Sequence, residues 1–77
     1  MGDKKEWICR PASAEADAAI TQAGGVEAAR ECRTGMVIAA INEKEARQFA
    51  ARDFAALYGA DAEEAWFHCE MDEDDAF

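Results

Sequence analysis

The side chains with the most obvious chemical potential are three cysteines and one histidine, at Cys9, Cys32, His68 and Cys69. Four such ligands are enough for a tetrahedral zinc site, and a cysteine beside a histidine is also a pair that serves nucleophilic catalysis. The spacing argues against both, because the chain has no Cys-x-x-Cys pair, and a strand would direct His68 and Cys69 to opposite faces. No phosphate-binding glycine loop is present either. We therefore expect no metal, no cofactor and no enzymatic activity.

The three cysteines are interpreted as small buried apolar side chains. Their odd number and wide spacing do not predict a disulfide framework. The chain has no apolar run long enough to cross a membrane, and the residues after Met1 do not form a signal peptide. These features predict a soluble protein of the cytoplasm, with reduced thiols.

The negative charge is concentrated at one end of the sequence. The formal net charge is -9, yet residues 1–60 carry nine acids and eight bases, whereas residues 61–77 carry eight acids and no Lys or Arg. Phosphates would repel this end, so direct binding to nucleic acid is disfavoured, and a basic protein surface is the expected partner. The run Asp72-Glu73-Asp74-Asp75 lacks the spacing and central glycine of a calcium loop. The candidate partner-binding residues are Glu63, Glu64, Trp66, Glu70, Asp72, Glu73, Asp74 and Asp75, with Trp66 as an exposed apolar anchor.

Several elements have clear local signals. A β-favouring segment over residues 5–10 is closed by Pro11 and predicts a first strand, and a helix over residues 14–23 follows the N-cap residue Ser13. A second helix begins after Asn42, with Glu45 in a capping-box position, and continues to Gly59. Residues 65–71 alternate as a last strand, with Trp66, His68 and Glu70 on the face opposite to Phe67, Cys69 and Met71. The expected core comprises Trp7, Ile8, Ile20, Val26, Val37, Ile38, Ile41, Phe49, Phe54, Leu57, Tyr58, Trp66 and Phe67.

The segment 26–33 is ambiguous, because its composition permits a helix while its residues also alternate. We predict that residues 26–32 and 36–41 form a hairpin, which gives the order βαββαβ of a ferredoxin-like α+β sandwich, with two helices on one face of an antiparallel sheet. The alternative makes residues 26–33 helical and leaves a three-stranded sheet. Residues 1–71 form the single domain in this prediction, and residues 72–77 form an acidic C-terminal tail.

In size, acidity and lack of catalytic motifs, with the run Glu70-Met71-Asp72-Glu73-Asp74-Asp75, the chain resembles small phage-encoded anti-defence inhibitors, namely anti-CRISPR and anti-restriction proteins. The resemblance lies in overall composition and carries over no residue role. It implies an inhibitor that acts as a nucleic-acid mimic on a CRISPR effector complex or another DNA-binding protein in the host cytoplasm. The alternative is a homodimerising assembly module whose acidic tail maintains solubility. A helix-turn-helix regulator is the least favoured function, because residues 36–41 offer no side chain that reads bases.

Overall fold

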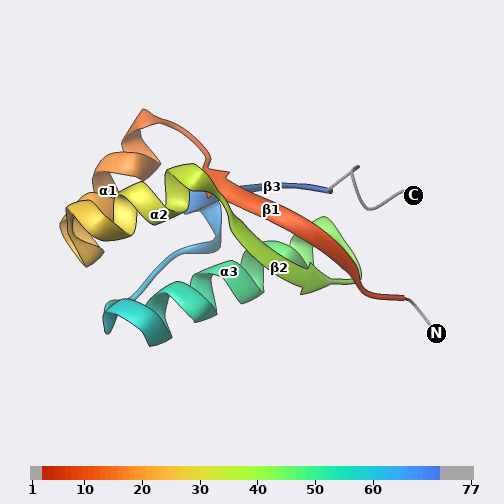
Figure 1. Ribbon diagram of the computed structural model, residues 1–77. Helices are drawn as coiled ribbons and strands as arrows, with labels where there is room; N and C mark the ends of the chain where they lie inside the picture. The colour runs from red at the N-terminus through yellow and green to blue at the C-terminus, as the bar shows by residue number, and fades with distance from the viewer. Residues whose placement is uncertain (1–2, 72–77) are drawn as a thin grey trace.

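The computed structural model describes residues 3–71, and Figure 1 shows a sheet with the helices on one side of it. None of the helices in this described part has both the length and the apolar character needed to span a membrane. The elements in chain order are β1 (Lys5–Pro11), α1 (Ala14–Gly24), α2 (Val26–Thr34), β2 (Met36–Ala40), α3 (Glu43–Tyr58), the short 3-10 helix η1 (Glu64–Trp66) and β3 (Phe67–Met71).

The sheet is antiparallel, with the strand order β2-β1-β3. One face packs against α3, which contacts all three strands, while the α1–α2 pair contacts β1. Along β1, Trp7 and Cys9 are buried, whereas Glu6 and Arg10 are exposed on the opposite face. The same alternation continues in β2 and β3, so the second face of the sheet is open to solvent.

The helices with strong local signals begin and end as predicted. The Ser13 hydroxyl accepts a hydrogen bond from the Ala16 N–H and caps α1. At the start of α3, the Asn42 side chain accepts from the Glu45 N–H, and the Glu45 carboxylate accepts from the Ile41 N–H. The capping interaction is therefore reciprocal, although it reaches one residue further back than a standard capping box.

The predicted strand over residues 26–32 is wrong, because this segment is the helix α2. Its buried residues, Ala28, Ala29 and Cys32, have the spacing of one helical face. Gly25 and Gly35, both at positive φ, bound the helix. The ferredoxin-like order βαββαβ is therefore not met. The described chain is an α+β fold of order βααβαβ with a three-stranded sheet, which was the alternative considered from the sequence.

The core is smaller and richer in alanine than expected. Phe54, Phe67 and Ile20 are its largest fully buried side chains, and the Trp7 indole N–H donates to the Ala40 carbonyl at 3.0 Å. Four of the predicted core residues are instead exposed, because α2 and α3 bury mainly alanines and the sheet has one open face. These four are Val26, Val37, Ile41 and Leu57.

Two of the three cysteines form a disulfide, contrary to prediction. Cys9 and Cys69 lie directly opposite each other on β1 and β3, with their Cα atoms 4.0 Å apart. The pairing depends on the register of strands that are 60 residues apart in the sequence, which spacing alone does not give. Cys32 is the buried free thiol that was expected. Because disulfides persist mainly in oxidising surroundings, the cytoplasmic location stays a prediction.

Candidate functional site

The acidic residues chosen from the sequence do not form one cluster in the described part of the chain. Glu63 and Glu64 are exposed where the chain enters η1, before β3 begins. Glu70 is exposed near the end of β3, on the open face of the sheet, with its carboxylate 3.3 Å from His68 Nε2. The strand separates these two positions by roughly 10 Å or more. Asp72, Glu73, Asp74 and Asp75 lie outside the described residues.

Trp66 does not face away from the core, contrary to prediction. It lies in η1 before β3, is partly buried, and its ring packs edge-on against Phe54 with centroids 6.1 Å apart. Its carbonyl also accepts a hydrogen bond from the Ala12 N–H at 2.8 Å. These contacts give Trp66 a structural role, and its role as a partner anchor stays a prediction.

The free edge of β2 is a second candidate surface, and the register shows which backbone groups it presents. Cys9 and Cys69 have the close Cα spacing of a non-hydrogen-bonded pair, so the backbone groups of Cys9 point toward β2. The Ala12 N–H bonds on the β3 side, in agreement with this alternation. Cys9 is therefore hydrogen-bonded to Met36, and it follows that the N–H and C=O groups of Val37 and Ala39 point outward. Within residues 3–71, no strand pairs with that edge.

The two edges of the sheet differ in chemical character. Edge strands in soluble proteins are usually protected by charged residues, by proline or by a bulge, because unpaired backbone groups attract other strands. β3 carries His68 and Glu70, whereas β2 has the sequence Met-Val-Ile-Ala-Ala without a charge or a proline. The Val37 side chain is also 63% exposed. β2 is thus an unprotected apolar edge.

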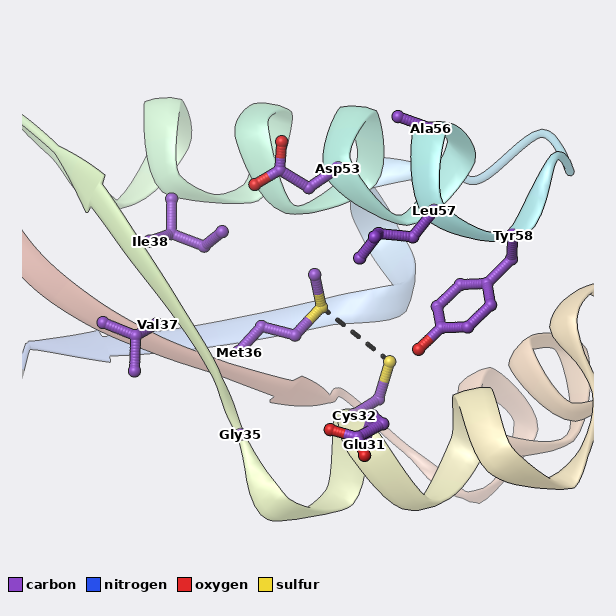
Figure 2. Close-up of a pocket in the computed structure, with 10 residues that line it drawn as sticks. All are labelled: Glu31, Cys32, Gly35, Met36, Val37, Ile38, Asp53, Ala56, Leu57 and Tyr58. Atoms are coloured by element: carbon purple, nitrogen blue, oxygen red, sulfur yellow. Dashed lines mark hydrogen bonds between the residues drawn. The ribbon is translucent and has the colours of Figure 1, made fainter.

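A groove of about 440 Å³ lies beside this edge, between α2, β2 and α3. Figure 2 shows Met36 and Leu57 in its middle, with Glu31 projecting from α2 and Asp53 from α3 on opposite sides. Leu57 is 70% exposed although it lines the groove. The groove therefore combines an apolar floor with two exposed carboxylates on its rim.

The electrostatic environment of the groove is negative. Burial raises the pKa of the Cys32 thiol, and the charges of Asp17 and Glu31 raise it further. Burial also raises the pKa of Tyr58, with smaller contributions from Cys32, Glu31 and Glu27. Figure 2 shows the hydroxyl of Tyr58 directed toward Cys32, whose sulfur lies 3.8 Å from that of Met36. The floor of the groove is therefore neutral at physiological pH and is surrounded by carboxylates.

These groups favour binding over chemistry. A thiol with a raised pKa stays protonated and is a poor nucleophile. Residues 3–71 contain no group of three His, Cys, Asp or Glu side chains placed to hold a metal ion. The zinc site considered from the sequence loses two of its four ligands to the disulfide. An edge strand beside an acidic groove is suited to hold an extended segment of another chain.

No protein-family model, curated protein or solved structure matches the chain. Sequence reasoning did not assign a partner-binding role to Glu31, Val37, Asp53 or Leu57, four of the residues that line the groove. The uncharged composition of residues 36–40 was the available signal. An uncharged strand indicates a binding surface only when it lies at the edge of a sheet. The predicted four-stranded order did not identify residues 36–40 as an edge strand.

Proposed function

We propose that this protein is a non-catalytic binding module for a basic partner protein, which it contacts through the free edge of β2 and the adjacent acidic groove. The unprotected edge is the observation that carries the proposal, because an exposed apolar strand is costly to a soluble protein unless another chain covers it. The net charge of -9 favours a partner of opposite sign and speeds association with it.

A narrower form of the proposal is inhibition of a nucleic-acid-binding protein. Carboxylates on the protein would occupy a Lys- and Arg-lined surface that otherwise binds phosphates, in the way implied by the resemblance to those anti-CRISPR and anti-restriction proteins that mimic the charge of nucleic acid. The excess of acidic over basic residues in the sequence supports this form. The partner would be a CRISPR effector complex or another DNA-binding protein, and binding would exclude DNA from it.

The test is affinity capture from a bacterial lysate at low salt, elution with rising salt, and a DNA-binding assay on each purified captured protein. We expect a nucleic-acid-binding protein that elutes as salt screens the charges and loses its DNA when this chain is added. Capture that survives high salt unchanged would contradict recognition by charge. A captured protein that keeps its DNA in the complex would contradict the inhibitory form alone.

Two matched variants then separate the candidate surfaces. One replaces those acids chosen from the sequence that lie within the described residues, Glu63→Gln with Glu64→Gln and Glu70→Gln, and the other replaces the groove acids, Glu31→Gln with Asp53→Asn. We expect the groove variant to lower partner affinity more than the first variant does. The reverse order would place the working surface on η1 and β3, which belong to the region that the sequence predicted.

A homodimer is the second candidate function, because the β2 edge of one copy can pair with that of another. Such a dimer would join two three-stranded sheets into one. Analytical ultracentrifugation over a range of concentrations tests it. A concentration-dependent dimer that Val37→Lys abolishes would support assembly as the function. We expect a monomer, since two copies of net charge -9 repel each other.

A further inference from the structure

We infer that the partner binds as an extended segment that adds to the free edge of β2 and places one Arg or Lys side chain in the groove between Glu31 and Asp53. The inference rests on the proposed binding function and specifies its geometry. It requires a strand edge with free backbone groups, a groove reached from that edge, and a charge arrangement that selects the inserted side chain.

The backbone of β2 meets the first requirement. Val37 and Ala39 each present an N–H and a C=O outward, so the edge offers four groups for hydrogen bonds over a short stretch. A segment that adds to a sheet edge gains its affinity from such main-chain bonds and its specificity from the pockets that receive alternate side chains. Every second side chain of the added segment would face the same side as α3.

The position of the groove meets the second requirement, because the groove can be reached from the strand edge. α3 packs against β2, and Leu57 and Asp53 stand on the part of α3 that faces the edge. A side chain directed from the added segment toward α3 would therefore enter the groove. Its volume of about 440 Å³ is sufficient for the largest side chains.

The rim of the groove supplies the third requirement, a charge arrangement that selects the inserted side chain. An Arg or Lys side chain has an apolar stem and a cationic end, and the groove offers Met36 and Leu57 to the stem and two carboxylates to the end. Neither Glu31 nor Asp53 has a basic partner among the ion pairs of the described residues. An acidic or purely apolar side chain would leave these charges uncompensated.

The same charges argue against a second copy of this chain as the occupant. β2 itself carries no base, so pairing of two β2 strands would bring no cation to either groove. A dimer would also bring two chains of net charge -9 together. The partner segment is therefore expected to belong to a different, basic protein.

The test is an NMR titration of the full ¹⁵N-labelled chain at low salt with a capped peptide of sequence Thr-Val-Arg-Val-Thr. We expect the largest shifts at the amides of Val37 and Ala39. Peptides with Gln or Glu in place of the central Arg should bind more weakly, the Gln peptide by roughly twofold to fivefold for the loss of an exposed ion pair. Methylation of the peptide nitrogens on one set of alternate residues should abolish binding, and methylation of the other set should not.

Two lysine variants provide a matched pair. Val37→Lys and Val26→Lys replace the same residue type at 63% and 64% exposure, but only Val37 borders the groove. We expect Val37→Lys, whose side chain lies on the open face of the sheet beside the added segment, to weaken peptide binding by about threefold or more through repulsion of the cationic peptide, and Val26→Lys to change it by less than about twofold. Dispersed spectra of both free variants confirm folding. If Val37→Lys fails to fold, Leu57→Lys takes its place.

The outcomes distinguish this inference from the proposed function. Equal binding of the Arg, Gln and Glu peptides overturns the role of the groove. Shifts confined to the amides of Glu63, Glu64 and Glu70 overturn the location and leave recognition of a basic partner intact. No shift up to the solubility limit of the peptide overturns strand addition, whereas capture of a basic partner in the lysate experiment would still support the broader proposal.

Discussion

The pair Asp17 and Arg33 shows how single residues hold the acidic groove in place. Arg33 donates from Nε and Nη2 to the two carboxylate oxygens of Asp17, at 2.6 and 2.7 Å. This bidentate bond joins α1 to α2, which are connected in the chain by Gly25 and also pack against each other. Since Glu31 and Cys32 directly precede Arg33, the bond also fixes the helix end that forms one side of the groove.

Replacement of Asp17 by Asn is expected to lower the free energy of unfolding at neutral pH, and the effect should disappear in acid. The hydrogen bond from Arg33 holds the pKa of Asp17 below its ordinary range. A lowered folded-state pKa contributes stability above the unfolded-state pKa of about 3.9, and this contribution is lost as the pH falls through the folded value. Denaturant titrations of wild type and Asp17→Asn between about pH 7 and pH 2 measure it. A difference independent of pH, or an equal effect of Glu15→Gln on the same helix, would contradict this origin.

At the scale of elements, sequence prediction succeeded where the signal was local. The caps Ser13 and Asn42 located the starts of α1 and α3, and Pro11 closed β1. The segment of α2 lacked such a signal, because its alanines and charged residues fit both a helix and an alternating strand. Its helical state follows from tertiary packing of Ala28, Ala29 and Cys32 against the rest of the core. The candidate site was missed for a related reason, since the edge position of β2 depends on how many strands the sheet contains.

The α2–β2 junction is an element boundary that is sensitive to substitution. Gly35 has a φ of 117°, and a Cβ atom at this position would lie 2.7 Å from Ile8 Cγ2. Gly35→Ala is therefore expected to destabilise the fold by about 1–3 kcal/mol or more. Gly59→Ala is the control, because Gly59 also has a positive φ, but a Cβ there would meet no atom within 4 Å. Thermal and denaturant unfolding of both variants measure the difference, and an equal loss in the two would exclude the contact with Ile8 as a cause.

At the scale of the whole molecule, one covalent bond offsets the small core. The core is built largely of alanines, so that little apolar surface is buried per residue. The disulfide joins the central strand β1 to the edge strand β3, across 60 residues of sequence. Closing so long a loop restricts the unfolded chain and thereby favours the folded state.

Loss of the disulfide should lower the free energy of unfolding by about 2–5 kcal/mol. The comparison uses wild type and the double variant Cys9→Ala with Cys69→Ala, each with and without a thiol reductant. We expect the reductant to lower the melting temperature of the wild type and to leave the double variant, already less stable, unchanged. Mass spectrometry after thiol alkylation provides the direct check. Three alkylated cysteines in the unreduced, air-exposed protein would contradict the bond.

The bond between Cys9 and Cys69 also gives the molecule the topology of a ring. All of the helices and β2 lie between the two cysteines, so the backbone and the disulfide together form one closed covalent circuit. A protease that cuts the exposed connection between Gly59 and Glu63 leaves a single molecule, with the nicked ends held by the fold and by the remainder of the ring. Two cuts between Cys9 and Cys69 are required to release a fragment of the ring. After a single cut within the ring, the elements that form the groove therefore stay covalently attached to the rest of the molecule.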